Sequence, residues 1–312
     1  MTLADLGGDR ERMSSPHSPS AIRGAFSAAA GYLAWGLFPL YWKQLAAVDA
    51  MELIAHRHVW SLLFVGAMMT ATGSLRELGA ALRSGAAWRW HALSGVLLTL
   101  NWLVFIWGVN HGQVVEASLG YFLVPLLNVA LGRFVLHETL RRLQWAAIGC
   151  ATAGVLVLLV RVGRLPWIAL SLAATFGAYG LLRKKSPLGA VAGLGLETLL
   201  LAPCAIAFLW WREIAGGGAL GHASLGTHVL LVSAGVVTAV PLLLFAYGAR
   251  QIRFTTLGLL QYIAPTVQFA IGVLVYREDF SAGRAWAFAL IWTGLALYTV
   301  DNLWSQRRIT EG

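Results

Sequence analysis

An arginine and a glutamate stand deep inside apolar stretches of this sequence, where a charged side chain needs a chemical reason. Arg57 is the centre of the tripeptide His56-Arg57-His58, and Glu197 follows a run of small and aliphatic residues. If such a stretch spans a membrane, a charge at its middle costs about 2.5–3.5 kcal/mol on insertion scales. A buried arginine can clamp an anion, and a buried carboxylate can carry a proton. The structural alternatives are an ion pair or an interface contact for Arg57, and hydrogen bonds between helices for Glu197.

Two further glutamates begin apolar stretches and share this ambiguity. Glu52 and Glu116 are the possible ion-pair partners of Arg57, and a carboxylate at a helix start is also favoured by the helix dipole. We expect Glu52, His56 and Glu197 to be the candidates for carrying a proton. We expect Arg57 and Glu116 to belong to the set that binds a ligand.

Polar and aromatic residues recur inside the apolar stretches and are candidates for lining a cavity. Their amides could hydrogen-bond a polar ligand or join helices to each other, because buried polar groups must pair somewhere. Their aromatic rings offer stacking or cation–π contacts. The set comprises Trp35, Tyr41, Asn101, Trp102, Trp107, Asn110, Tyr121, Asn128, Tyr179, Gln261, Tyr262 and Gln268.

Long apolar stretches supply the helices that would position these residues. The chain has 312 residues, of which 58% are hydrophobic and 12% charged, and this composition excludes an ordinary soluble domain. About 20 apolar residues cross a hydrocarbon layer of roughly 30 Å. We therefore expect an all-α membrane protein with ten transmembrane helices. The stretches lie near 23–46, 51–72, 89–110, 115–136, 143–161, 165–183, 189–211, 227–249, 254–276 and 283–304.

Residues 105–160 recur at 245–300 without a gap, which indicates a duplicated unit. The matched pairs are Phe105 and Phe245, Gly108 and Gly248, Pro125 and Pro265, Gly132 and Gly272, Glu138 and Glu278, and Gly154 and Gly294. Because five helices is an odd number, the second unit must enter the membrane from the opposite side, which makes an inverted five-plus-five repeat. The expected segments are a flexible cytoplasmic tail at 1–22, a first repeat at 23–161, a second repeat at 165–304 and a cytoplasmic tail at 305–312.

The duplicated glutamates and prolines carry different expectations. Glu138 and Glu278 end predicted helices close to arginines, so we expect a structural role for both. Pro125 and Pro265 fall inside predicted helices, where a proline removes a hydrogen bond and permits a kink. Such kinks either serve as hinges or fix static packing.

Lysine and arginine fix the expected orientation. Most of them fall in the connections on the side of the N-terminus, so the positive-inside rule predicts that both termini are cytoplasmic. The net charge of +9 is then largely a signal of topology, and no basic domain remains to bind nucleic acid.

Motifs for other functions are absent from the sequence. There is no Walker A loop, no GxSxG, no HExxH and no CxxC pair, so we expect neither an enzyme nor a cofactor. A metal site from His56 and His58 is not expected, because positions i and i+2 of a helix do not share a face.

Five segments together resemble the EamA-type permeases of the drug/metabolite transporter superfamily, and most closely the RarD group. They are ELIAHRHVW at 52–60, NWLVFIWGVN at 101–110, EASLGYFLVP at 116–125, YGLLRK at 179–184 and QYIAPT at 261–266. The polar N-terminal tail is longer than in some relatives, and His58 is not expected throughout the group.

The resemblance implies a permease of the bacterial inner membrane, with a cavity between its halves and small-molecule substrates. By analogy with the family, the cavity would be lined by Trp35, Asn101, Trp107, Tyr121, Tyr179 and Gln261. We expect a secondary transporter, with export favoured, that moves a small metabolite, amino acid or drug by alternating access. Coupling to protons, uncoupled exchange and a non-transporting scaffold remain the alternatives. The oligomeric state is not predicted.

Overall fold

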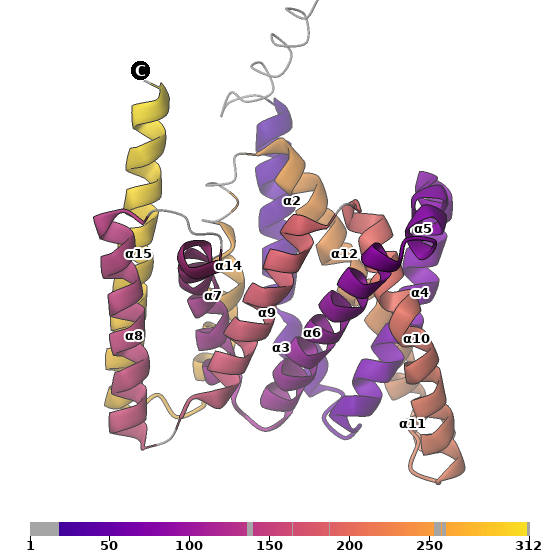
Figure 1. The fold of residues 1–312 in the computed structure, drawn as a ribbon. Helices are drawn as coiled ribbons and strands as arrows, with labels where there is room; N and C mark the ends of the chain where they lie inside the picture. The colour runs from indigo at the N-terminus through magenta and orange to yellow at the C-terminus, as the bar shows by residue number, and fades with distance from the viewer. Residues whose placement is uncertain are drawn as a thin grey trace, which may run out of the picture. The chain divides into compact units, whose positions relative to one another are not determined.

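Helices joined by short connections make up the described part of the chain. The computed structural model describes residues 19–135, 140–163, 165–186, 188–252, 257 and 260–310, and no strand occurs among them. The helices in Figure 1 are α2 (Pro19–Gly36), α3 (Phe38–Lys43), α4 (Ala50–Thr72), α5 (Leu75–Leu82), α6 (Gly85–Asn110), α7 (Val114–Val135), α8 (Arg142–Val162), α9 (Trp167–Lys185), α10 (Ala190–Ile214), α11 (Ala219–His222), α12 (Leu225–Gln251), α14 (Ile263–Ala270), the π-helix η1 (Ile271–Val275) and α15 (Ala282–Thr310).

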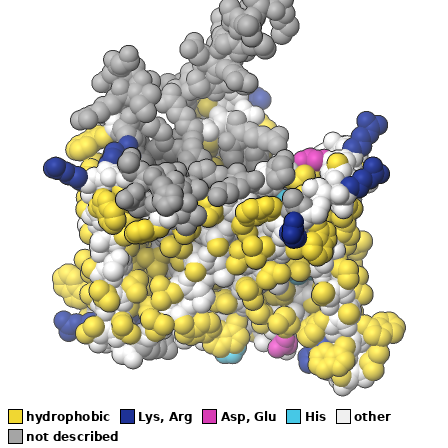
Figure 2. Space-filling view, in the orientation of Figure 1, with side chains coloured by type: hydrophobic (Ala, Val, Ile, Leu, Met, Phe, Trp, Pro, Cys, Tyr) yellow, Lys and Arg dark blue, Asp and Glu magenta, His cyan; other side chains and the backbone are white. Residues whose placement is uncertain are grey.

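Several helices are suited to a lipid environment. Within the described residues, four stretches are long and apolar enough to cross a membrane, and α4 with α5 makes a fifth if that bent pair is one span. The four stretches are 87–110, 142–161, 191–214 and 225–245. Figure 2 shows hydrophobic side chains over most of the described surface on one face. The predicted all-α membrane class is confirmed. The ten-span inverted arrangement stays a prediction, and its ninth span at 254–276 includes residues outside the described part.

The helix that carries Arg57 has well-defined ends. At its start the Asp49 side chain accepts hydrogen bonds from the backbone N–H groups of Met51 and Glu52, at 2.9 and 3.3 Å, which is a standard N-cap. At its end Gly73 adopts φ 72°, the left-handed conformation that glycine tolerates best. Helix α5 follows at a bend of 114°. The sequence analysis predicted α4 closely but left α5 as a connection.

The first predicted span, 23–46, is not one continuous α-helix. Helix α2 ends at Gly36 and α3 begins at Phe38. Pro39 is the second residue of α3, where its missing N–H costs no helical hydrogen bond. The proline therefore coincides with a new helix start, and it does not kink a single long helix.

Two compact units make up the fold, and each combines distant parts of the sequence. The first, here called unit 1, contains residues within 1–38, 112–173 and 241–312, and unit 2 contains residues 39–111 and 174–240. In unit 1, α8 packs along α15 and α7 packs on α14. In unit 2, α10 packs along α4 and α6. The units are defined by which helices pack together, whereas the predicted repeats are defined by the duplicated sequence. The units therefore do not test the repeat boundaries, which stay a prediction.

Helices α8 and α15 approach each other through a reciprocal pair of glycines. A Cβ built on Gly154 would lie 2.9 Å from Ala287 O, and one built on Gly294 would lie 2.7 Å from Ala147 O. The two contacts are related by the same 140-residue shift as the duplicated glycines. Gly154 of α8 contacts Ala287 of α15, and Ala147, earlier in α8, contacts Gly294, later in α15. The two helices therefore run antiparallel. A two-fold axis produces this pattern at a symmetric interface.

Candidate functional site

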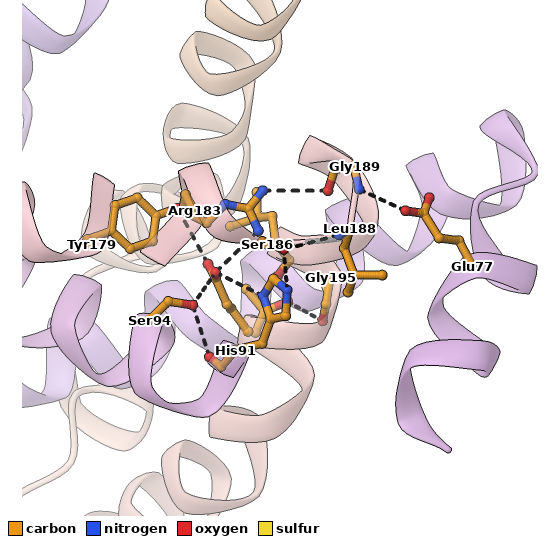
Figure 3. Close-up of polar contacts among 12 residues, drawn as sticks. Glu77, His91, Ser94, Tyr179, Arg183, Ser186, Leu188, Gly189 and Gly195 are labelled. Carbon is orange, nitrogen blue, oxygen red and sulfur yellow. Dashed lines mark hydrogen bonds and ion pairs between the residues drawn. The ribbon is translucent and has the colours of Figure 1, made fainter. Parts of the chain in front are cut away.

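Glu197 of α10 is the centre of a buried polar network in unit 2, and only 2% of its surface is exposed. From α6, Ser94 Oγ donates to Glu197 Oε1 at 2.6 Å, and His91 Nδ1 lies 3.2 Å from the same oxygen. From α9, Arg183 Nη1 lies 3.4 Å from Oε1, and the Tyr179 hydroxyl lies 3.5 Å from Oε2. Figure 3 shows how these side chains converge. The two carboxylate oxygens therefore differ, since most of the donors reach Oε1.

The His91 imidazole extends this network to the connection between α9 and α10. Its Nε2 lies 2.8 Å from Ser186 Oγ, which accepts a hydrogen bond from Leu188 N at 3.1 Å. In the same connection, Gly189 N donates to the Glu77 carboxylate of α5 at 2.7 Å. Side chains that can exchange protons thus run from the buried carboxylate to a connecting segment, and α5 holds that segment in place.

Arg57 lies on α4 in the same unit and is 4% exposed. Its guanidinium carbon is 4.7 Å from the centre of the Trp102 ring, within the range of a cation–π contact. Among the described residues, no carboxylate forms an ion pair with Arg57, and its Nε has no hydrogen-bond partner. A buried cation that packs on an aromatic face without a carboxylate in ion-pair contact is unusual, because desolvation is offset only in part.

A cavity of about 10 Å³ lies beside Arg57. That volume is near the lower limit for a single water molecule, so the cavity is closed in this conformation. Helices α4, α6, α10 and α12 supply its walls. The polar residues that line it are Arg57, His58, Ser61, Glu197, Thr198 and Thr238.

Comparisons with known proteins place this helical chain in a family. The sequence pattern described as "EamA-like transporter family" matches residues 22–160. The "Uncharacterized transporter YojE" of Bacillus subtilis (strain 168) is 42% identical over 286 residues, covering 90% of this chain and 95% of that protein. "Protein RarD" of Escherichia coli (strain K12) is 40% identical over 289 residues, covering 93% and 98%. The chain belongs to the EamA-like transporter family.

Other comparisons agree with this membership. The "Chloramphenicol-sensitive protein RarD" of Pseudomonas aeruginosa is 32% identical over 274 residues, covering 85% of this chain and 89% of that protein. A solved crystal structure, described only as that of a protein, covers 89% of this chain with a TM-score of 0.58 and 22% identity, and it supports the fold alone. The predicted resemblance to EamA-type permeases close to RarD is confirmed, and the chain is a multi-pass membrane transporter.

In this EamA-like protein, unit 2 brings together several of the predicted ligand-binding residues. Arg57 and Glu197 line the cavity. Tyr179 contacts Glu197, and Trp102 packs on Arg57. Asn101 is buried and donates through Nδ2 to Thr175 Oγ1 at 2.9 Å. Trp107 instead stacks on His111 near the end of α6, with ring centres 4.0 Å apart.

Glu52 and His56 lie in a different cluster of unit 2. Glu52 Oε2 is 3.3 Å from Arg212 Nη2, and Glu52 Oε1 accepts from Ala219 N at 2.5 Å. His56 Nε2 lies 3.9 Å from the same carboxylate. Glu52 therefore ties the start of α4 to the segment that follows α10, and it is not the ion-pair partner of Arg57. Its role as a proton carrier stays a prediction.

The other predicted site residues of this protein lie in unit 1. Gln268 of α14 is buried and donates to Trp35 O at 3.1 Å, which joins α14 to α2. Glu116 accepts a hydrogen bond from Ile168 N at 3.1 Å. Tyr121, Gln261 and Tyr262 are half-buried, whereas the side chain of Asn128 lies outside the described residues. A shared cavity for the complete set stays a prediction.

The duplicated glutamates and prolines are only partly described. Glu278 accepts from Val114 N at 2.7 Å and from Val115 N at 2.8 Å, so it caps the start of α7. Glu138 lies outside the described residues. Pro125 is in the interior of α7, whereas Pro265 is the third residue of α14, where a helix needs no donor. The hinge argument from a lost hydrogen bond therefore applies to Pro125 more than to Pro265.

Sequence analysis missed His91, Ser94 and Arg183 as members of the Glu197 network. Arg183 appeared only as the last residue of the predicted span 165–183 and as part of the motif at 179–184. His91 and Ser94 are three residues apart, so they share a face of α6, and this spacing was the available signal. In the described residues, no group of three or more His, Cys, Asp or Glu side chains could hold a metal ion.

Proposed function

We propose that this protein is a secondary transporter of the bacterial inner membrane, with cytoplasmic termini, that moves a small metabolite, amino acid or drug by alternating access. We further propose that Glu197 couples this movement to protons. Family membership supports the transport function. The arrangement around Glu197 carries the proposal of coupling, because a carboxylate enclosed by exchangeable groups is the usual basis of a membrane proton relay.

The asymmetry between the two oxygens of Glu197 supports this role. Ser94, His91 and Arg183 all approach Oε1, whereas Tyr179 approaches Oε2 at the longer distance of 3.5 Å. A proton on Oε2 would leave the three contacts to Oε1 in place. The imidazole of His91 then offers a route to the connection that begins at Ser186, and the proton can be exchanged there.

Uncoupled exchange is the second candidate function. The ion pair with Arg183, at 3.4 Å, favours it, because such a pair can serve only to hold α9 against α10. In that case the network would be structural. The protein would move its solute only down the solute's own gradient.

Flux measurements in proteoliposomes separate these functions. The panel contains amino acids, amphenicols and cationic drugs, each tested with and without an imposed pH gradient, and Glu197→Gln is the variant. Glutamine keeps the shape of the side chain and an oxygen acceptor but cannot carry the proton. We expect native flux to respond to the gradient, and the variant to retain exchange without that response. Native flux that does not change with the imposed pH gradient, in either direction, would exclude coupling to protons.

A further inference from the structure

The cavity beside Arg57 has polar atoms that nothing in the described part of the chain satisfies. Arg57 Nε, His58 Nδ1, Ser61 Oγ and Thr238 Oγ1 are all buried and all lack a hydrogen-bond partner. The four residues are between 3% and 5% exposed, and all of them line the cavity. Buried polar groups are nearly always paired. Three of these atoms, Arg57 Nε, Ser61 Oγ and Thr238 Oγ1, carry a hydrogen to donate, so they indicate a site for an external hydrogen-bond acceptor.

The orientation of Arg57 suits a carboxylate. The face of its guanidinium is covered by Trp102, so its N–H groups, which lie in the guanidinium plane, remain to bond a ligand at the edge. A planar carboxylate matches that edge and can accept two parallel hydrogen bonds. The hydroxyl groups of Ser61 and Thr238 can each donate one more. His58 Nε2 lies 2.9 Å from Thr99 Oγ1, whose own hydrogen goes to Gly95 O, so Nε2 is the donor and Nδ1 of the neutral ring is an acceptor that does not contact the carboxylate.

The charges around the cavity also favour an anion. Arg57 from α4 and Arg183 from α9 supply two guanidinium groups, and Glu197 from α10 supplies one carboxylate. His58 and His91 are the imidazoles of the set, and with both neutral the set keeps one excess positive charge. The α12 residues that line the cavity, Thr238 and Ala239, are uncharged. A bound monoanion would neutralise the excess, whereas a zwitterion would leave it unchanged.

We propose that this cavity binds the carboxylate of a small monoanionic solute, with Arg57 as its principal contact and Ser61 and Thr238 as further donors. The inference rests on the proposed transport function and names the substrate class of that function. Because the cavity now has room for about one water molecule, the carboxylate enters only when the surrounding helices separate. The expected order of preference is a monocarboxylate, then its amino acid analogue, then its neutral amide.

Matched probes test this preference on the full-length protein in detergent. The panel pairs acetate with acetamide, lactate with lactamide, and 3-phenylpropionate with 3-phenylpropanamide, and adds phenylalanine as the zwitterion. Binding is followed by Trp fluorescence and by the midpoint of thermal unfolding. We expect at least one acid to bind at least about tenfold more tightly than its amide, and Arg57→Met to remove that difference. If no acid binds better than its amide, the cavity holds water only and the proposal is wrong.

Stability gives a second test, because a structural arginine and a ligand-binding arginine respond differently to removal. Arg57→Met deletes a buried, unpaired cation and leaves a side chain that packs on Trp102, so the unfolding midpoint should stay the same or rise. Arg212→Met is the matched control, because it breaks the ion pair with Glu52 and should lower the midpoint. A fall for Arg57→Met as large as that of the control would make Arg57 structural and overturn the proposal.

Flux assays distinguish a failure of this inference from a failure of the proposed function. Binding of an acid through Arg57, with no flux of that acid in proteoliposomes, would leave the site standing and reject transport. Undiminished flux of a neutral or cationic solute in Arg57→Met would leave transport standing and reject the carboxylate site. Loss of acid flux in a folded Arg57→Met protein, with exchange restored in part by Arg57→Lys, supports both.

Discussion

The two compact units use buried polar groups in opposite ways. Among the described residues, the buried polar side chains of unit 1 are those of Ser118, Gln268 and Asp301, and all the others belong to unit 2. The buried core of unit 1 is instead mostly aliphatic, with a cluster of aromatic rings packed against it. Phe269 lies 4.9 Å from Phe288 and 5.6 Å from Trp292 between ring centres, and Phe288 lies 5.7 Å from Trp292.

The difference distinguishes polar side chains that join helices through hydrogen bonds from polar side chains that are available to bind a ligand. In unit 1, Glu278 and the Nε2 of Gln268 bond backbone groups of neighbouring helices, although Gln268 Oε1 and the Tyr262 hydroxyl have no partner among the described residues. In unit 2, Glu197 bonds other side chains, and Arg57 has an unfilled donor. Satisfied polar groups rigidify a fold, whereas unsatisfied ones cost stability and need another reason to be kept.

The largest expected effect is that of Glu197→Ala, because it removes the centre of the unit 2 network. Ser94, His91 and Arg183 would lose their shared acceptor, and breaking a buried pair from one side costs about 3–5 kcal/mol of unfolding free energy. The measurement is unfolding by SDS titration in mixed micelles. Thr198→Ala is the matched control, since Thr198 donates only to carbonyls of its own helix. A loss no larger than that of the control would remove the contrast between the units.

A smaller loss is expected for Glu278→Ala in unit 1. The variant would leave the N–H groups of Val114 and Val115 uncapped, and the cost is about 2–3 kcal/mol for two hydrogen bonds to a charged acceptor. Stability should fall while flux per folded molecule stays at the native level. Asp279→Ala, at the exposed neighbouring position, should change neither quantity. A specific loss of flux in Glu278→Ala would give unit 1 a share in the chemistry.

The smallest effect concerns helix packing in unit 2. A Cβ on Gly235 of α12 would lie 2.5 Å from the backbone carbonyl of Trp60 in α4, so Gly235→Ala should cost about 1–3 kcal/mol by overpacking. Gly66→Ala on α4 is the control, because no atom lies within 4 Å of its added Cβ. Thermal unfolding of both variants would measure the difference. Equal midpoints would show that α12 yields to the methyl group without cost.

Sequence patterns predicted the helices better than the site. The class, the family and the extent of helices such as α4 and α8 followed from apolar length and from motifs, which are local properties. The breaks were harder to predict, because Pro39 permits a helix start as readily as a kink. Helix α5 was missed because it is too short and too polar to span a membrane.

The site could be predicted only in part, because it depends on which helices meet. Arg57 and Glu197 were recognised from their cost in an apolar stretch. The role of Glu52 was ambiguous, since its partner Arg212 is distant in sequence. Ser61 and Thr238 gave no signal, because hydroxyl groups inside helices usually bond their own backbone.

Because paired helices are distant in the sequence, one helix of each pair is synthesised well before its partner. Helix α8 is complete about 120 residues before α15 begins, and at roughly 5–20 residues per second its partner arrives about 6–24 s later. The interval between the end of α4 and the start of α10 is about as long. During those intervals the glycine face of α8 lacks α15, and Arg57 has its contact with Trp102 of α6 but lacks the cavity wall that α10 supplies. A chain released after residue 240 but before α15 would hold every residue of unit 2 and would lack the last helix of unit 1.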